Sequence, residues 1–313
     1  MSLNSSIDRT FYLENIVFGD INRVEEFQID PGGKGINVAR MVHILGGKSI
    51  GISFLGGKNG TLIKNLLEKE NIKLIFIRTK GETRNIFNFI EKKTGKILRI
   101  NEKGPKILRK EKNSLFNLLG KINFSNQDIF SISGSLPQGM EKTTYKKIIK
   151  KLKKKICFIA LDSDGEPLKE GIKAKPFLIK PNLWELERLV EGKIDSLTKL
   201  KNTCEKLLNF GISIILLTLG EKGAVLFSKG KKVYAKPPKV KLESDVGCGD
   251  AFLAGFLYKF SQKEKLEKCL KFAVASGTAK AMKKGTSMPT KNEVLKLVKK
   301  VKFLPLEVLN NIF

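Results

Sequence analysis

Histidine and cysteine, which supply many metal sites and nucleophilic active sites, are scarce in this chain of 313 residues. The single histidine, His43, excludes a zinc site with several histidine ligands, and a Ser-His-Asp or Cys-His mechanism would have to use that one residue. The cysteines Cys157, Cys204, Cys248 and Cys269 do not stand at CxxC spacing, so we predict neither a zinc knuckle nor a redox pair. We interpret His43 as an ordinary helix residue.

Long apolar runs are also missing from the sequence. Hydrophobic residues make up 41% of the chain, but no run approaches the roughly 18 to 20 residues needed to cross a bilayer. The first residues, MSLNSSID, have neither the basic segment nor the apolar stretch of a signal peptide. We therefore expect a soluble, cytoplasmic protein with no membrane partner.

Acidic residues are few relative to basic ones, with 31 Asp and Glu against 59 Lys and Arg and a formal charge of +28. Such a charge is a feature of nucleic-acid-binding proteins. The basic runs at residues 150–155 and 296–302, however, contain no aromatic residue that could stack on bases. We interpret the lysines as solvated helix faces and predict no nucleic-acid partner, with a non-enzymatic nucleic-acid-binding protein as a distant alternative. A positive field would also attract anionic sugar phosphates and nucleotides.

From about residue 121 onward, short apolar runs alternate with amphipathic segments. This rhythm predicts parallel strands joined by helices, within one α/β domain that spans residues 1–313. We expect strands at residues 128–133, 157–162, 177–180 and 212–218. Because ligands of open α/β sheets bind beyond the carboxyl ends of the strands, functional residues are expected in the loops that follow.

Two segments, residues 9–30 and about 73–101, contain strand-like patches that do not follow this rhythm. We predict that they form a small sheet outside the main one, with residues 91–96 as a hairpin turn. This sheet would cover the site as a discontinuous lid. Since an isolated small sheet exposes an apolar face and open edges, we expect two lids to pack together in a homodimer.

The segment at residues 245–257, DVGCGDAFLAGFL, carries the strongest chemical signal. Gly247 and Gly249 permit a tight turn whose amides can converge on an anion, and the helix that follows directs its positive end to the same point. Asp250 could accept a proton from an attacking hydroxyl while the amides stabilise a transferring phosphoryl group. A simple carboxylate at a helix N-terminus would give the same pattern.

A second glycine loop opens an amphipathic helix at residues 31–40, PGGKGINVAR. It is neither a P-loop nor a GxGxxG motif. Its glycines let a ligand approach the backbone, and Lys34 and Asn37 would add charge and hydrogen bonds. A helix-entry turn without a ligand is the alternative interpretation.

The two segments together resemble the paired signatures of the ribokinase-like PfkB carbohydrate kinases. Residues 180–185, KPNLWE, are similar to the KPNxxE element of that family, and residues 218–224, TLGEKGA, to its nucleotide-binding strand end. The resemblance covers essentially the whole chain. It implies a ribokinase-like α/β fold, with a mainly parallel central sheet flanked by helices, and an ATP-dependent kinase activity.

By this resemblance, Asp250 would be the catalytic base, and the amides of Gly247, Cys248 and Gly249 would form an anion hole. ATP and Mg²⁺ would be the cofactors, and Glu185 would hold the metal through water. The residues implied for the nucleotide end are Lys180, Asn182, Glu185, Thr218, Gly220 and Gly223.

The sugar side resembles the hexose-phosphate branch of the family, that of 1-phosphofructokinase and tagatose-6-phosphate kinase. The residues this implies around the sugar are Asp8, Gly32, Gly33 and Asn37. Arg84, with Arg99 and Lys34 as weaker candidates, would bind the phosphate already on the substrate, and a solvated charge is the alternative for each. Fructose 1-phosphate is the expected substrate; the alternatives are tagatose 6-phosphate and, more distantly, a ribokinase or nucleoside kinase activity.

The sequence departs from the family pattern at its start. The resemblance implies a hydrophobic strand before the LNSSID segment, where only Met1 and Ser2 stand. We therefore expect a truncated central strand, in which case either the start is incomplete or another segment fills the place.

Overall fold

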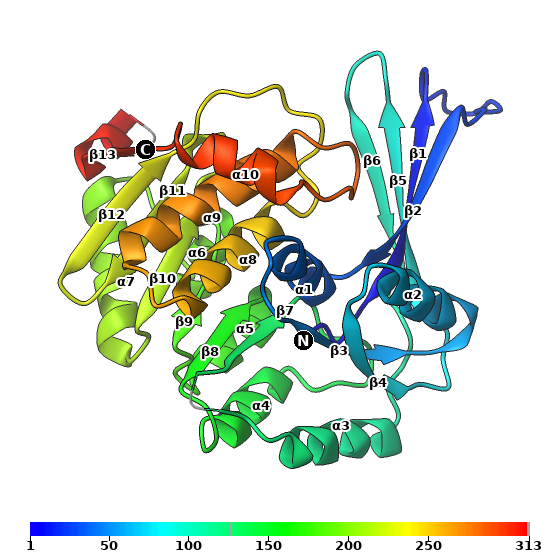
Figure 1. Ribbon diagram of the computed structural model, residues 1–313, viewed down its shortest axis with the longest axis horizontal. Helices are drawn as coiled ribbons and strands as arrows, with labels where there is room; N and C mark the ends of the chain where they lie inside the picture. The colour runs from blue at the N-terminus through cyan, green and yellow to red at the C-terminus, as the bar shows by residue number, and fades with distance from the viewer. Residues whose placement is uncertain (126, 312–313) are drawn as a thin grey trace.

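The centre of the fold is a seven-stranded sheet, seen in a computed structural model that describes residues 1–125 and 127–311 (Figure 1). Its strand order is β13-β12-β11-β10-β9-β8-β7. The bounds are β7 Ile129–Ser133, β8 Phe158–Asp162, β9 Leu178–Ile179, β10 Ile214–Thr218, β11 Ala224–Ser228, β12 Lys231–Lys236 and β13 Lys302–Leu304. The sheet is parallel from β7 to β10 and antiparallel from β10 to β13. The four strands expected from the sequence are β7 to β10.

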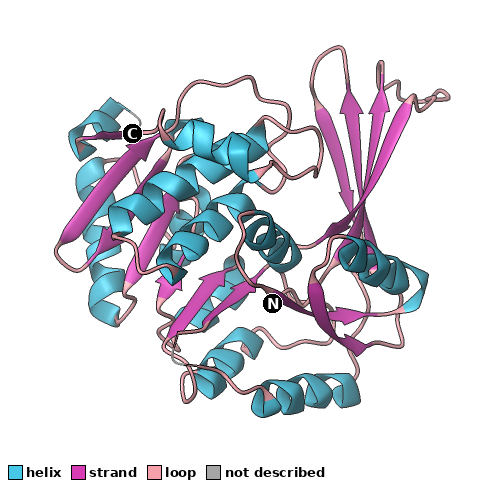
Figure 2. Ribbon diagram, in the orientation of Figure 1, coloured by secondary structure: helices cyan, strands magenta, loops and turns pink. Residues whose placement is uncertain are grey.

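Helices cover both faces of this sheet (Figure 2). One face packs against α1 Lys34–Ile44, α8 Cys248–Ser261, α9 Leu266–Ala281 and α10 Lys291–Val298. The other packs against α3 Arg109–Lys121, α4 Thr144–Leu152, α5 Gly165–Ile172, α6 Leu183–Val190 and α7 Leu197–Phe210. Along β10, Ile214 and Leu216 face the first group, whereas Ile215 and Leu217 face the second. A strand buried on both faces needs apolar residues at every position, which explains the continuous apolar run in the sequence.

The small sheet stands beside this body and has the strand order β2-β1-β5-β6 (Figure 1). Its bounds are β1 Ser6–Leu13, β2 Glu26–Gly32, β5 Arg84–Glu91 and β6 Ile97–Asn101. The predicted hairpin is confirmed, because β5 and β6 pair antiparallel and Gly95 in their turn has a φ of 73°. Only glycine adopts that backbone region without strain.

One strand predicted for the small sheet lies elsewhere. Residues 73–78, which form β4 (Lys73–Arg78), pair in parallel with β3 (Ile50–Leu55) in a separate two-stranded sheet. The prediction was wrong here because α2 (Gly57–Lys69) precedes β4, and a strand, a helix and a strand in succession form a parallel unit. Apolar residues of α2, β1 and β3 pack together around Ile7, Leu55 and Ile63.

The first two residues connect the main sheet with the two-stranded sheet of β3 and β4. The backbone amide of Ser133 in β7 donates to Met1 O at 3.0 Å, and the amide of Ser2 donates to Ile52 O in β3 at 2.9 Å. Ser2 also forms a parallel bridge with Ser53. Met1 and Ser2 thus lie between β7 and β3.

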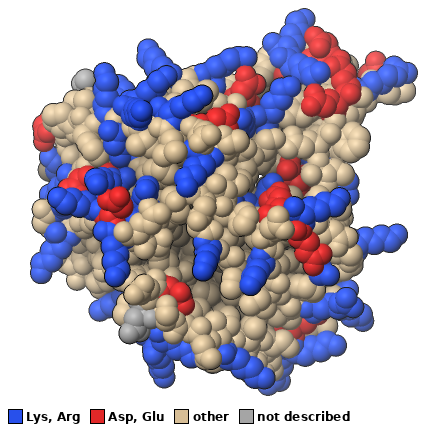
Figure 3. Space-filling model, in the orientation of Figure 1, with Lys and Arg blue, Asp and Glu red and all other residues tan. Residues whose placement is uncertain are grey.

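Lysine and arginine side chains are spread widely over the face of the molecule in Figure 3. In the run 150–155, Leu152 is buried at the end of α4, while Lys153 to Lys155 are exposed. The run 296–302 has the same arrangement around the buried Leu297 of α10. These runs are therefore solvated sides of amphipathic helix ends. None of the helices that the structure describes is long and apolar enough to span a bilayer.

Candidate functional site

The two glycine segments meet at Asp250, near the N-terminus of α8. Gly247 caps this helix with a φ of 75° and is followed by Cys248 and Gly249 in its first turn. Asn37 of α1 donates from Nδ2 to Asp250 Oδ2 at 2.8 Å, although the two residues are 213 positions apart in the chain. Helices α1 and α8 pack against each other, and this packing holds the bond in place.

The Asp250 carboxylate is nearly inaccessible, with 5% of its surface exposed. Burial raises its pKa to about 6; Lys34 opposes this shift, Asp162 adds to it, and Asn37 and Lys180 also oppose it. A carboxylate with a pKa of about 6 is largely ionised at neutral pH and is still a stronger base than an exposed aspartate. Such a carboxylate can accept a proton from a nearby hydroxyl.

A buried ion cluster lies beside this carboxylate. Asp162, at the end of β8, has a fully buried side chain, and its Oδ1 lies 3.3 Å from Lys34 Nζ and 3.2 Å from Lys180 Nζ. Lys34 also lies 3.7 Å from Glu185 Oε1. The negative charge of Asp162 is the main cause of a raised pKa at Lys34. Sequence reasoning missed Asp162, although its position after a parallel strand was the available signal.

The residues predicted for the nucleotide end lie at the carboxyl ends of β9 and β10. Asn182 caps α6 by accepting from the Glu185 amide at 2.8 Å, and Glu185 Oε2 accepts from the Asn182 amide at 2.9 Å. Asn182 also forms a parallel bridge with Thr218. Trp184 lies two residues after Asn182 and is 59% exposed. The Arg188 guanidinium lies 4.4 Å from the centroid of its ring.

Gly220 and Gly223 differ in what surrounds them. A Cβ at Gly223 would lie 2.2 Å from Ala235 O, and its φ is 104°, so close packing on β12 already requires glycine there. Gly220 has a φ of 60° and no atom within 4 Å of such a Cβ. Of the two, only Gly220 has open space beside it.

On the sugar side, Asp8 of β1 lies directly over Gly32. A Cβ at Gly32 would be 2.0 Å from Asp8 Oδ1, so only glycine leaves room for this carboxylate. Ser6 Oγ donates to the same Oδ1 at 2.6 Å. Burial raises the pKa of Asp8 to about 6, and the nearby charges of Asp30 and Asp250 also raise it. Gly33, with a φ of 109°, then turns the chain into α1.

The three basic candidates for the substrate phosphate lie in different places. Arg84 donates to Asn4 O from Nε at 3.2 Å and from Nη2 at 3.0 Å, and to Glu102 O from Nη1 at 3.1 Å. Arg99 of β6 forms an ion pair with Asp245, just before the glycine turn. Lys34 belongs to the Asp162 cluster.

The structure offers little for a metal held by protein alone. Among residues 1–125 and 127–311, no group of three or more His, Cys, Asp or Glu side chains is placed to hold an ion. The donors that remain are oxygens, among them Glu185 Oε1 and the buried Asp162 Oδ2, which has no hydrogen-bond partner. Such a set fits Mg²⁺ that keeps much of its water and binds mainly to phosphates.

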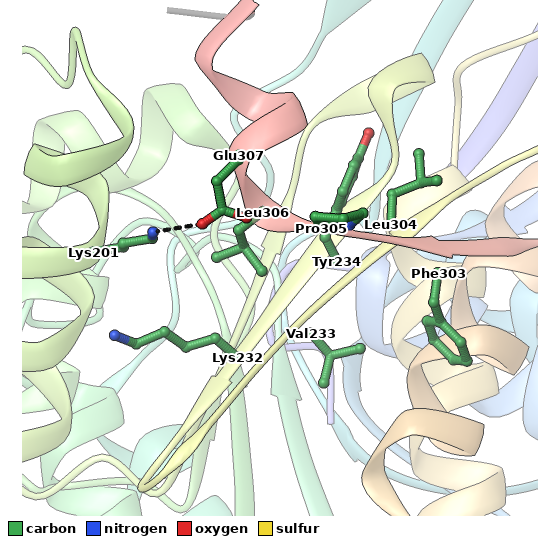
Figure 4. A pocket seen from close by; sticks show the side chains of 9 residues that line it. All are labelled: Lys201, Lys232, Val233, Tyr234, Phe303, Leu304, Pro305, Leu306 and Glu307. Carbon is green, nitrogen blue, oxygen red and sulfur yellow. Dashed lines mark hydrogen bonds and ion pairs between the residues drawn. The ribbon is translucent and has the colours of Figure 1, made fainter.

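A groove lies at the β13 edge of the main sheet, between α7 and the strands β12 and β13 (Figure 4). Lys201 and Glu307 form an ion pair of 3.3 Å across it. None of its lining residues is among the predicted site residues. They are Lys201, Lys232, Val233, Tyr234, Phe303, Leu304, Pro305, Leu306 and Glu307.

Several known proteins are similar to this chain in sequence. Residues 1–293 match the model of the pfkB family carbohydrate kinases. The chain is 35% identical over 285 residues to a 1-phosphofructokinase of Borreliella burgdorferi, with 90% of this chain and 91% of that protein covered. It is 34% identical over 289 residues to a tagatose-6-phosphate kinase of Staphylococcus epidermidis, with coverage of 91% and 92%.

Among solved structures, phosphofructokinase-2 from Escherichia coli in complex with substrates and products is similar, with a TM-score of 0.91 and 28% identity. The match covers 96% of this chain and 97% of that one. The expected ribokinase-like α/β fold, with helices flanking a central sheet and a separate small sheet, is confirmed.

We predict that Asp162→Asn lowers the free energy of unfolding by about 3 kcal/mol at pH 7, because it leaves the buried Lys180 without its counter-charge. Urea denaturation measures this change. Asp164→Asn is the matched control: Asp164 forms an exposed pair with Arg188, and asparagine caps α5 equally well, so its cost should stay below about 1 kcal/mol. Equal effects of the two substitutions would contradict a buried ion cluster.

Proposed function

Because the chain belongs to the pfkB family of carbohydrate kinases, we propose that it transfers a phosphoryl group from ATP to fructose 1-phosphate, giving fructose 1,6-bisphosphate. The observation that carries the proposal is the bond from Asn37 to Asp250, which unites the two signature segments at one buried carboxylate. Relatives that act on hexose phosphates match nearly the full chain. Tagatose 6-phosphate is the second candidate substrate, since a tagatose-6-phosphate kinase is nearly as similar.

In the proposed reaction, Asp250 takes the proton of the attacking hydroxyl. Its Oδ2 accepts from Asn37, which leaves Oδ1 for the incoming proton. The first amides of a helix have no acceptor within the helix, so those of Gly247 and Gly249 can bind oxygens of the transferring group. The Cys248 amide would do so by giving up its long bond of 3.4 Å to Asp245 O. The Cys248 thiol takes no part, because burial raises its pKa to about 11 and keeps it neutral.

ATP would bind beyond the ends of β9 and β10, with its phosphates directed at the glycine turn. Lys180, Asn182 and Glu185 surround the phosphate side, and Thr218 and Gly220 border the nucleotide. Gly223 would shape this end through its packing on Ala235 and not through a ligand contact. Mg²⁺, when bound through water to Glu185, would neutralise phosphate charge.

The sugar would lie between the glycine loop of α1 and the small sheet. Asp8 and Asn37 would form hydrogen bonds with its hydroxyls. Gly32 and Gly33 would let the sugar approach the backbone closely. Arg84 is the proposed anchor of the existing phosphate. Its bonds to Asn4 O and Glu102 O hold the guanidinium plane in place and leave one N–H on each terminal nitrogen for the ligand.

A coupled assay of ADP release tests this function. We expect the highest kcat/KM with fructose 1-phosphate or tagatose 6-phosphate, and much lower values with fructose 6-phosphate, ribose and adenosine. Arg84→Ala should raise KM for the preferred sugar phosphate at least about tenfold, through loss of a charged hydrogen bond, and should change residual activity on unphosphorylated sugars little. A preference for ribose or adenosine, or equal losses on both substrate classes, would count against the proposal.

We predict that Asp250→Asn lowers kcat by about 10²- to 10⁴-fold, the usual contribution of a positioned general base. Asparagine keeps the size of the side chain but cannot take the proton. Steady-state kinetics at saturating MgATP measure the loss, and isothermal titration should show nearly unchanged substrate binding. A decrease of less than about tenfold would mean that Asp250 is not the base.

The pH profile provides the control for this assignment. Burial raises the pKa of Asp250 to about 6, and the base acts only when ionised. The kcat of the wild type at saturating substrate should therefore fall as the pH decreases through about 6, and Asp250→Asn should lack this acidic limb. The limb is read from kcat because Asp8, which would bind the sugar, also has a pKa of about 6 and would affect kcat/KM in both proteins.

The small sheet is also the proposed dimer interface, because one of its faces is apolar and open. Directly paired residues share a face, so Phe27, Phe11, Phe89 and Leu98 form a row across all four strands. Phe27 is 64% exposed and Leu98 39%. The opposite face carries Asp8, Arg84 and Arg99. A second copy of the chain would cover the apolar row. The opposite, polar face of each small sheet would still lie over the substrate site of its own subunit.

We predict that sedimentation at micromolar concentrations shows a homodimer and that Phe27→Glu converts it to a monomer. In a dimer of this variant, each subunit would bury one unpaired carboxylate in the apolar interface. Phe303→Glu is the control: Phe303 is also exposed (45%) but lies on β13 of the main sheet. A monomeric wild type, or a dimer that tolerates Phe27→Glu, would exclude this interface.

A further inference from the structure

Lys280 is a completely buried lysine for which the proposed reaction has no use. It lies in the last turn of α9, with 0% of its surface exposed, and its Nζ donates to Gly285 O at 2.8 Å. Within the described part of the chain, no carboxylate forms an ion pair with it inside 4.0 Å. Lys180, the other lysine nearly as buried, has Asp162 at 3.2 Å.

Such an ammonium is costly for the fold. Removal of a charge from water costs several kcal/mol, and an apolar replacement of similar volume is often neutral or stabilising. Burial lowers the pKa of Lys280, whereas Cys248, Asp30 and Asp250 favour the charged form from a distance. The C-terminal end of α9 also favours a positive charge. Stability alone therefore does not explain a lysine at this position.

The contacts of the side chain point to the glycine turn. A Cβ at Gly247 would lie 3.4 Å from Lys280 Cε, so the aliphatic part of the lysine passes beside the residue that caps α8. The neighbouring carbonyl, Ala281 O, accepts from the amides of Glu243 at 2.8 Å and Ser244 at 3.2 Å. The end of α9 thus holds the chain that leads into the turn.

The ammonium itself holds a different segment. Gly285, its acceptor, belongs to residues 283–287, which also reach the small sheet. Thr286 donates to Asp30 of β2, and Gln28 of β2 donates to Ser287 Oγ at 2.8 Å. Lys280 is therefore where the glycine turn, the end of α9 and the segment that supports the small sheet come together.

We propose that Lys280 is a positioning residue, an internal cation that fixes the glycine turn relative to residues 283–287 and so presets the turn amides for the transferring phosphoryl group. This inference rests on the proposed function. It predicts a residue whose charge is needed for turnover but not for stability.

Lys280→Met tests this separation. Methionine fills nearly the same volume, so thermal melting should show an unchanged or higher Tm, while kcat falls at least about tenfold and KM for the sugar phosphate changes less than about threefold. Lys268→Met is the control, because Lys268 lies on the same helix but is largely exposed and pairs with Glu264 at 3.1 Å. A kcat within about twofold of the wild type, or a lowered Tm that accompanies the loss, would overturn the proposal.

Two further measurements separate this proposal from the kinase assignment. Hydrogen exchange of residues 243–252 and 283–288 should accelerate in Lys280→Met and not in Lys268→Met, whether or not a substrate has been found; unchanged exchange would refute the role of Lys280. In Lys280→Ala, ammonium chloride should restore kcat, whereas tetramethylammonium chloride at equal ionic strength should not. Equal responses to the two salts would show that no cation site is formed. A wild type inactive on every sugar phosphate would instead refute the proposed function.

Discussion

The carboxylate of Asp162 is the charge on which the arrangement of the site depends. It lies between Lys34, from the start of α1, and Lys180, from the end of β9, in a region without solvent around the carboxylate. Without it, the several kcal/mol needed to bury Lys180 would not be offset, and Lys34, whose side chain is 39% exposed, would keep only Glu185 as a neighbouring carboxylate. This one group joins the ends of β8 and β9 to the first glycine loop, and Lys34 extends the cluster to Glu185 of α6.

The same cluster sets the electrostatics of Asp250. Lys34 and Lys180 lower the pKa of Asp250, while burial and Asp162 raise it. The result is a carboxylate that is ionised at neutral pH but retains some basicity, close to the compromise that general-base catalysis requires. Helix α8 contributes the rest, because its first amides and its dipole favour negative charge at the position where phosphoryl oxygens would lie.

Local patterns in the sequence were sufficient for much of the fold, whereas the roles of the site residues stay predictions. The continuous apolar runs predicted β7 to β10, the Thr94-Gly95 turn predicted a hairpin, and the glycines before Asp250 predicted the turn that opens α8. The features that were missed depend on partners far apart in the chain. Lys34 meets Asp162 across 128 residues, and Arg84 meets Asn4 across 80. Lys280 gave no signal either, since in sequence it is one lysine among many.

Trp184 gives the protein a property of a different kind. It is the only tryptophan in the chain, and it stands in the first turn of α6, exposed and stacked on the Arg188 guanidinium. All indole fluorescence therefore originates two residues from Asn182, at the end of the sheet where ATP would bind. The tryptophan fluorescence of the protein therefore reports on that end of the sheet alone. Any change that moves Arg188 or alters the solvent around the ring will change the emission.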